Sequence, residues 1–219
     1  MNILVFSDTH LGSLFEEKKF NFLSALIDQV DRVIINGDFW EGYGTSFDRF
    51  VNSPWKQLFP KLKAKQAIYI FGNHDRQILS DKRTALFSKI QTDRFALKPN
   101  GTRFIFEHGH RLCPIMDEPS PPSKRLVVAT YLTGKAEEIM TITNNKAIKR
   151  FLLGKYNNII KRKLKKELSD NEVLICGHTH LSEFNIKERF VNTGIVRHGL
   201  AQYLLIQNGH LYPKEEWYE

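Results

Sequence analysis

Five short clusters of polar side chains each follow an apolar run in this chain. They are Asp8-Thr9-His10, Gly37-Asp38, Gly72-Asn73-His74-Asp75, His108-Gly109-His110 and Gly177-His178-Thr179-His180. Aspartate, asparagine and histidine supply the oxygen and nitrogen atoms that bind divalent cations. One such cluster carries little information. Five of them, each after a strand-like run, indicate a fold that gathers strand ends around one polynuclear metal site.

The first half of the chain alternates between strand-like and helix-like segments. Strands are predicted over 2–6, 32–36 and 67–71, and helices over 16–30 and 47–62, with the second helix interrupted near Pro54 and Pro60. This βαβαβ order predicts parallel strands, whose carboxyl ends meet at one edge of the sheet. The side chains expected at that edge are Asp8, His10, Asp38, Asn73 and His74.

The second half of the chain has a different pattern. Short strands are predicted over 103–107, 172–176, 189–192 and 202–207, with a hairpin turn at 207–210. The stretch from about 114 to 168 has no strand signal and begins with a proline-rich loop at 119–123, after which apolar residues recur at helical spacing. We therefore expect one domain over residues 1–219 that carries a helical insertion over about 114–168, capping the sandwich.

The positive charge of the chain is concentrated in one segment. Residues 146–167 hold nine cations and one acid, so this segment accounts for the whole net charge of +8. Such a patch favours an anionic partner: nucleic acid through residues 146–166, an anionic membrane surface, or a phosphorylated substrate. A solvated helix face is the equally open alternative.

The two cysteines and the first residues of the sequence indicate the cellular compartment that we expect for the protein. Cys113 and Cys176 are far apart and read as ordinary buried thiols rather than a disulfide or a metal site. The sequence shows no basic leader and no transmembrane segment, so we expect a cytoplasmic protein, with a position peripheral to the membrane as the alternative.

The types of candidate ligand narrow the choice of metal. Carboxylates, imidazoles and an asparagine carbonyl, without cysteine, suit Mn²⁺ most, with Fe or Zn²⁺ as alternatives. A carboxylate can bridge two ions, and Asp38 is the central candidate. Two divalent ions can activate a water molecule and neutralise a phosphoryl group, so the expected chemistry is phosphoester hydrolysis.

Taken together, the five clusters resemble the signature of the calcineurin-like metallophosphoesterase superfamily, in the same order and over almost the whole chain. The resemblance implies an α/β fold, a four-layer α/β/β/α sandwich of two mixed β-sheets, with a dinuclear metal centre. One ion would be bound by Asp8, His10, Asp38 and His180, and the other by Asp38, Asn73, His108 and His178. His74 would protonate the leaving oxygen or bind the phosphate, and Asp75 would orient its ring.

Several of these residues keep a second interpretation. Asp8 and Asp38, taken singly, could cap turns, and His74 with Asp75 could be a surface pair. His110 is interpreted as substrate-facing or structural, and Arg76, His110 and Arg111 are the expected substrate contacts. His198 and His210 are expected to have no metal role.

A narrower resemblance bears on the substrate. The segment 37–41 and the helical insertion resemble the UDP-2,3-diacylglucosamine hydrolases, although those enzymes usually carry arginine where this chain has His74, and aspartate where it has His110. We expect hydrolysis of a phosphodiester or pyrophosphate bond by a metal-activated water, on a nucleotide-linked or lipid-linked substrate. A nuclease acting on DNA or RNA is the first alternative, and a non-catalytic metal-binding member of the family is the second.

Overall fold

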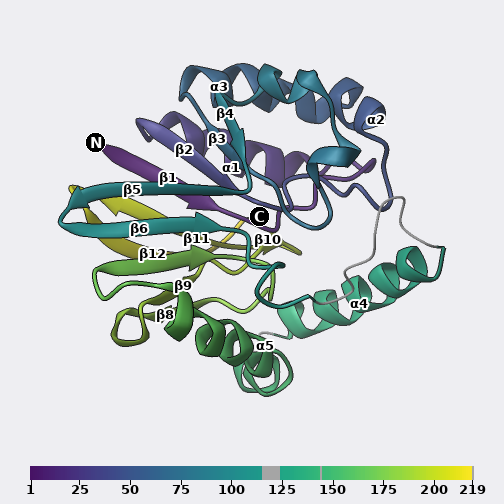
Figure 1. Cartoon of the computed structure of the whole chain (residues 1–219). Helices are drawn as coiled ribbons and strands as arrows, with labels where there is room; N and C mark the ends of the chain where they lie inside the picture. The colour runs from purple at the N-terminus through teal and green to yellow at the C-terminus, as the bar shows by residue number, and fades with distance from the viewer. Residues whose placement is uncertain (115–123, 144, 219) are drawn as a thin grey trace.

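A computed structural model describes residues 1–114, 124–143 and 145–218 of the chain. Two β-sheets pack face to face, and helices cover the outer face of each (Figure 1). The predicted α/β fold class, a four-layer sandwich of two mixed sheets, is confirmed.

The first sheet has seven strands in the order β10-β11-β1-β2-β3-β4, with β12 paired to β11. Its strands are β1 (Asn2–Phe6), β2 (Arg32–Asn36), β3 (Ile68–Ile70), β4 (Ile90–Thr92), β10 (Val196–Arg197), β11 (Leu200–Gln207) and β12 (His210–Trp217). β1 to β3 are parallel, as predicted, β4 is a further parallel strand that was not predicted, and β11 joins β1 in antiparallel register. The chain segments that leave β1, β2 and β3 therefore meet at one edge.

The second sheet has five strands in the order β5-β6-β7-β9-β8. They are β5 (Arg94–Asn100), β6 (Thr102–Glu107), β7 (Glu172–Cys176), β8 (Glu183–Asn185) and β9 (Phe190–Asn192). The central strands β6, β7 and β9 are parallel, and the two edge strands run antiparallel to their neighbours. The loops after β6 and β7 carry the fourth and fifth clusters to the same side of the molecule.

Helices on the outer face of the first sheet form the first layer. They are α1 (Glu17–Asp28), α2 (Phe47–Asn52) and α3 (Phe59–Ala64), with a 3₁₀ turn over Pro54–Leu58 between the last two. The helix predicted over 47–62 is thus interrupted as expected, because Pro54 has no N–H to continue the α-helical hydrogen bonds. Shorter 3₁₀ turns lie at Gln77–Leu79, Lys82–Leu86 and Ile186–Glu188.

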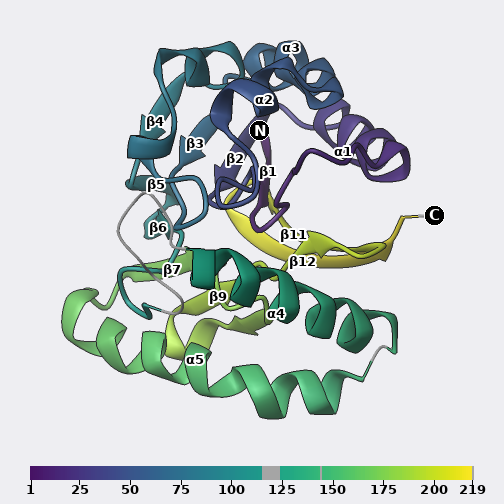
Figure 2. The same ribbon diagram turned by 90° about the vertical axis from the view of Figure 1, so that its right-hand side faces the viewer.

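Alternation along the strands separates three apolar layers. In β1, Leu4 and Phe6 pack among the outer helices, whereas Ile3 and Val5 lie between the two sheets. A third layer forms beneath the second sheet, where helix α5 (Lys146–Glu167) packs Ile160 and Leu164 against it. The helical prediction for this stretch is confirmed, and α5 forms the fourth layer of the sandwich (Figure 2).

Helix α4 (Lys124–Ile142) has a different position from α5. It crosses the side of the molecule where the strands of both sheets end (Figures 1 and 2). The predicted loop at 119–123 lies outside the described residues. Within the stretch expected to cap the sandwich, α4 and the first half of α5 lie nearest the strand ends.

Two further expectations concern the cysteines and membrane spans. Cys113 and Cys176 are both buried and free, as predicted. Within the described ranges, no helix is long and apolar enough to cross a membrane.

Candidate metal centre

The ligand-bearing loops leave their strands in an unusual backbone conformation. Asp8, His10, Asp38, His178 and His180 have φ angles of 53°, 43°, 51°, 71° and 60°. This left-handed region costs a non-glycine residue of the order of 1 kcal/mol or more. Such a conformation turns each side chain away from the path of its strand, and here four of them, all but His178, turn toward one point.

Two glycines are required by close packing around the carboxylates. A β-carbon at Gly72 would lie 2.1 Å from Oδ1 of Asp38, and one at Gly177 would lie 2.2 Å from Oδ2 of Asp8. Any side chain at either position would displace a candidate ligand. These glycines let neighbouring loops enclose the two carboxylates.

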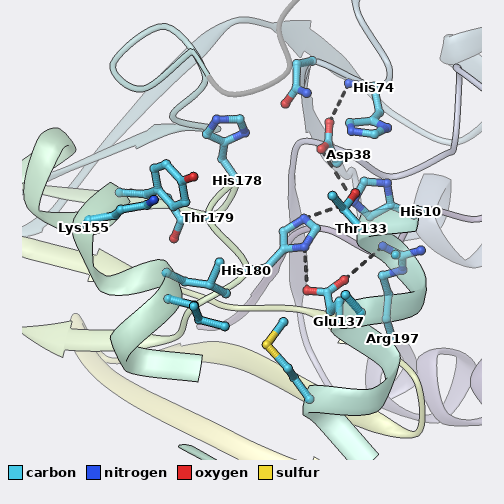
Figure 3. A pocket seen from close by; sticks show the side chains of 17 residues that line it. His10, Asp38, His74, Thr133, Glu137, Lys155, His178, Thr179, His180 and Arg197 are labelled. Atoms are coloured by element: carbon cyan, nitrogen blue, oxygen red, sulfur yellow. Dashed lines mark hydrogen bonds and ion pairs between the residues drawn. The ribbon is translucent and has the colours of Figure 1, made fainter. Parts of the chain in front are cut away.

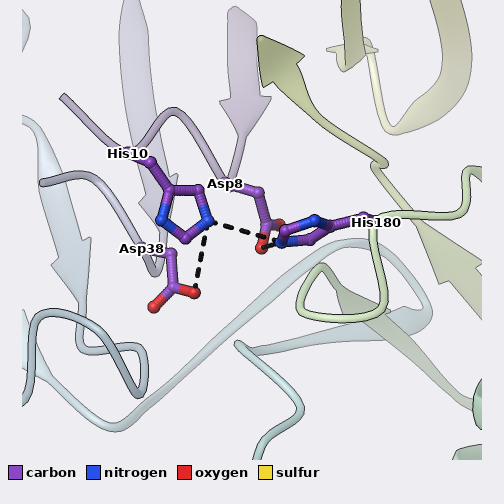
Figure 4. A group of neighbouring side chains, drawn as sticks. All are labelled: Asp8, His10, Asp38 and His180. Atoms are coloured by element: carbon purple, nitrogen blue, oxygen red, sulfur yellow. Dashed lines mark hydrogen bonds and ion pairs between the residues drawn. The ribbon is translucent and has the colours of Figure 1, made fainter. Parts of the chain in front are cut away.

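Four of the expected ligands lie together. Single ligand atoms of Asp8, His10, Asp38 and His180 all fall within 4.8 Å of one another (Figure 4). The Nε2 atoms of His10 and His180 are 3.3 Å apart, and Nε2 of His180 lies 3.2 Å from Oδ1 of Asp8. Two imidazole lone pairs repel at this distance unless a proton or a cation lies between them. The four residues expected to share one ion are therefore arranged as a cation site.

Hydrogen bonds at one nitrogen of each imidazole ring show which nitrogen is left to bind a metal. Nδ1 of His10 donates to Glu41 at 3.0 Å, Nδ1 of His180 donates to Glu137 at 2.6 Å, and Nδ1 of His108 donates to the Asn36 carbonyl at 2.9 Å. Each ring thus carries a proton on Nδ1, and its Nε2 faces the centre, where a metal ion would replace any proton on that nitrogen. Metal-binding histidines in proteins show this arrangement, so the side chains fit a bound divalent ion.

The second set of expected ligands is only partly assembled. Nε2 of His108 lies 3.2 Å from Oδ2 of Asp38, and Oδ1 of Asn73 is buried without a hydrogen-bond partner among the described residues. Nε2 of His178 donates to the Cys113 carbonyl at 2.6 Å, so Nδ1 is the nitrogen of this ring that could bind a metal. A second ion at Asp38, Asn73, His108 and His178 stays a prediction.

The structure corrects the pairing expected for His74. Its Nδ1 lies 2.8 Å from Oε1 of Glu41, so Glu41 orients this ring. The Asp75 carboxylate instead accepts backbone N–H groups from Asp38 at 3.1 Å and from Phe39 and Gly72 at 2.6 Å. Asp75 therefore connects the loop after β2 to the loop after β3 through hydrogen bonds. It is not the residue that orients His74.

The charges at the centre favour added positive charge. Although burial opposes it, the pKa of the Asp38 carboxyl lies well below its ordinary value, because His108 and His74 face it. Burial also opposes charge on the imidazoles, yet Asp38 and Asp8 raise the pKa of His108 to about 9, and Glu137 raises that of His180 to about 10. With no metal present, protons on these rings balance the carboxylates. A divalent cation would take that role.

Comparison with known proteins places the chain in a family. A sequence model of the calcineurin-like phosphoesterase superfamily domain matches residues 1–206. The chain belongs to this superfamily. No curated protein is significantly similar to it in sequence.

Solved structures similar to this superfamily member share little sequence with it. They include YfcE, a phosphoesterase from E. coli, at 15% identity over the whole of both chains and a TM-score of 0.48. A metallophosphoesterase from Sphaerobacter thermophilus has 15% identity over all of this chain and 90% of its own, with a TM-score of 0.49. A single mutant of Vps29 from Entamoeba histolytica has 15% identity over the whole of both chains and a TM-score of 0.45.

A cavity of about 350 Å³ opens beside the candidate metal centre of this phosphoesterase-superfamily chain (Figure 3). One side holds His10, Asp38, Asn73, His74, His178 and His180. The opposite side comes from α4 and α5 and includes the apolar side chains of Ala136, Met140, Leu152, Leu153 and Tyr156. The cations that line the cavity are Lys155 of α5 and Arg197 of β10. The cavity therefore joins a polar, metal-binding face to an apolar one.

The residues expected to contact substrate lie elsewhere. Arg76, His110 and Arg111 line a separate surface hollow with Phe71 and Asp93, not the cavity beside the metal centre. Arg111 is also paired with Glu107 at 2.8 Å and with Glu167 at 2.7 Å. The cations that face the metal-centre cavity are Lys155 and Arg197, neither of which belongs to the five clusters.

Two acidic residues of the site were not predicted. Glu41 appeared in the sequence analysis only within the segment 37–41, yet it contacts both His10 and His74. Glu137 lies on α4 and is 5% exposed, between His180 and Arg197, whose Nη1 is 3.2 Å from its carboxylate. Glu41 follows the second cluster closely, which is a usable signal. Glu137 has none, because a glutamate in a helix usually faces solvent.

Proposed function

We propose that this protein is a metal-dependent phosphoesterase that hydrolyses a phosphodiester or pyrophosphate bond. The observation that carries the proposal is the convergence of Asp8, His10, Asp38 and His180 within 4.8 Å at the wall of a cavity. Superfamily membership supports the same class of reaction. Mn²⁺ is the proposed ion, with Fe or Zn²⁺ as alternatives that also suit this oxygen and nitrogen donor set.

The chain's own residues have separable roles in this proposal. Asp8, His10, Asp38 and His180 would hold the first ion, and Asp38, Asn73, His108 and His178 would hold the second. The ions supply an activated water and neutralise phosphoryl charge. Glu41 fixes the His74 ring through Nδ1, which leaves Nε2 available to protonate the leaving oxygen.

The opposite wall of the cavity supports a choice of substrate class. Met140, Leu152 and Leu153 offer apolar surface of the kind that an acyl chain or another apolar group would cover. Lys155 and Arg197 provide positive charge near the same wall. We propose a small phosphate-linked substrate with an apolar portion, nucleotide-linked or lipid-linked.

Contact with an anionic membrane surface is proposed as the companion of a lipid-linked substrate. Several apolar side chains of α4 and α5 are exposed, among them Tyr131, Leu132, Ile139, Ile142 and Phe151, the last at 85%. Cosedimentation with phosphatidylglycerol vesicles tests this contact. Equal recovery with neutral and anionic vesicles would contradict it. The cytoplasmic location stays a prediction.

Hydrolysis of an aryl phosphodiester in the presence of Mn²⁺ tests the enzyme proposal. Asp38→Ala is expected to lose both bound metal and activity, because Asp38 contributes to both sets of ligands. His74→Ala is expected to keep its metal while kcat falls by roughly 10²–10⁴, the usual contribution of a general acid. Metal-loaded wild-type protein that turns over no phosphoester would favour the non-catalytic alternative.

A nuclease is the second candidate function. A surface hollow on α5 is lined by Lys155, Lys161, Arg162 and Lys165, and Lys155 also lines the metal-centre cavity. A nucleic-acid backbone could follow this row of cations into the site. Lys161, however, is already paired with Glu183 and Glu188. Oligonucleotide cleavage that falls steeply with salt would support the nuclease, and absence of binding at low salt would exclude it.

A further inference from the structure

A second cavity adjoins the metal-centre cavity at Met140, which lines both. It has a volume of about 290 Å³ and sits where the end of α4 and the start of α5 meet strands β11 and β12. Its polar lining comprises Thr141, Asn145, Lys146, Lys149, Arg150, Ser182, Gln202 and Glu215. Of the residues that line the metal-centre cavity, Met140 also lines this one. The two cavities are therefore adjacent but have different walls.

Three polar atoms in this lining are buried without a hydrogen bond. Within the part of the chain that the structure describes, Nζ of Lys149, Oγ1 of Thr141 and Oε1 of Gln202 have no partner. Their residues are only 8%, 3% and 8% exposed. Buried polar groups in native proteins are almost always hydrogen-bonded, because each unpaired one costs free energy. Three such atoms around one cavity indicate that a ligand completes them.

The charges around the cavity favour an anion as that ligand. Lys146, Lys149 and Arg150 contribute three cations, and Glu215 is the acid among the lining residues. Glu215 is already engaged, because it accepts from Lys146 at 2.6 Å and from Nε2 of Gln202 at 2.8 Å. Positive charge remains in excess at Lys149 and Arg150.

Lys149 has no acid close enough to form an ion pair within the described residues. Burial lowers the pKa of its ammonium group, although Glu137, Glu215 and Asp8 act in the opposite direction from a distance. An anion in contact with the ammonium would offset the cost of burying it.

We propose that this cavity binds an oxyanion of the phosphate class. Lys149 and Thr141 donate hydrogen bonds to its oxygens, and Oε1 of Gln202 accepts one from a protonated oxygen or a neighbouring hydroxyl. Lys146 and Arg150 add positive charge at the rim. This site is distinct from the metal centre and does not depend on the proposed hydrolysis.

Calorimetric titration of the Mn²⁺-loaded protein with inorganic phosphate tests the site. The wild type is expected to show one phosphate-binding component that Lys149→Met removes or weakens by about tenfold or more, as for loss of a charge-assisted hydrogen bond. Lys166→Met removes the same charge from an exposed position on α5 and lines neither cavity. It is expected to leave this component unchanged. Any phosphate bound at the metal centre persists in both variants, so a failed hydrolase proposal would not affect the result.

A second variant tests the site independently, in case Lys149→Met fails to fold. Thr141→Val keeps the volume of the side chain and is also expected to weaken the component, while thermal unfolding checks that both variants stay folded. A parallel titration with glycerol 3-phosphate distinguishes free phosphate from a phosphate ester, and Lys149-dependent binding of either supports the site. A wild type without this component, or affinities equal in the Lys149→Met and Lys166→Met proteins, would overturn it.

Discussion

Two carboxylates outside the expected ligand set hold the imidazoles of the candidate centre. Glu41 fixes His10 and His74, and Glu137 fixes His180. Each bond sets which nitrogen carries the proton and where the ring points, and it makes the opposite nitrogen a stronger donor to a metal. Glu137 is the more informative of the two, because it comes from α4 and connects that helix to a ligand that follows β7.

Removing the charge of Glu137 is expected to weaken metal binding while the fold is kept. Glu137→Gln retains the size of the side chain but loses the carboxylate that accepts from Nδ1 of His180. The affinity for Mn²⁺ should fall by roughly 10–100-fold, measured by electron paramagnetic resonance of free Mn²⁺. The matched control is Glu138→Gln on the same helix, where the carboxylate pairs with Lys135. If both variants bind Mn²⁺ equally well, Glu137 does not position His180.

At the scale of single residues, the sequence predicted the site residues that directly follow strands. It missed the residues that reach the site from other parts of the fold. Asp8, His10, Asp38 and His180 could be assigned because each follows an apolar run that can be recognised locally. Glu137 and Arg197 reach the site only through tertiary packing, which leaves no local pattern. The contacts assigned to Arg76 and Arg111 rested on proximity in sequence to two clusters, and the chain directs both side chains to another surface.

Among the elements, α5 is joined to the loop that carries two of the histidines. Asn157 of α5 is fully buried and accepts from Thr179 at 2.6 Å and from Asn192 at 3.2 Å. Its own amide donates to the Leu181 carbonyl at 3.1 Å. These bonds span the segment that contains His178 and His180. The helix therefore supports the geometry of the centre as well as covering the sheet.

Replacement of Asn157 is expected to loosen this connection. Asn157→Leu keeps a similar volume but leaves buried partners unsatisfied, so the free energy of unfolding should fall by about 2–4 kcal/mol. The exposed neighbour serves as the control, and Asn158→Leu should change stability by less than about 0.5 kcal/mol. Urea denaturation followed by circular dichroism measures both. Equal stability of the two variants would mean that α5 does not depend on this network.

The elements that could be predicted are those with buried, regular apolar runs. β1 and β7 match their predicted bounds, and the parallel order of the first three strands is as expected. The strands β4, β5 and β8 were missed, and all lie at or near sheet edges where they are only partly buried. β12 extends the predicted hairpin through a mostly exposed, charged segment. Apolar and polar residues need not alternate along a strand that is only partly buried, because neither of its faces has to be apolar.

At the level of the whole molecule, the two helices between β6 and β7 have different relations to the core. Ile160 and Leu164 of α5 are buried with Ile105, Leu174 and Phe190 of the second sheet. On α4, by contrast, Tyr131, Leu132, Ile139 and Ile142 are all more than half exposed. The sequence predicts one helical insertion over about 114–168, which includes both helices. Only the packed structure shows that α5 completes the sandwich while α4 reaches across the cavity.

This difference predicts unequal effects of the same substitution in the two helices. Ile160→Ala removes a side chain that is 0% exposed, and the transfer and cavity costs should lower the free energy of unfolding by about 2–5 kcal/mol. Ile139→Ala removes one that is 64% exposed and should change it by less than about 0.5 kcal/mol. Urea denaturation midpoints with unchanged m-values would give both numbers. A loss at Ile139 as large as that at Ile160 would show that α4 is also part of the core, in which case variants of Glu137 would report on folding rather than on the metal.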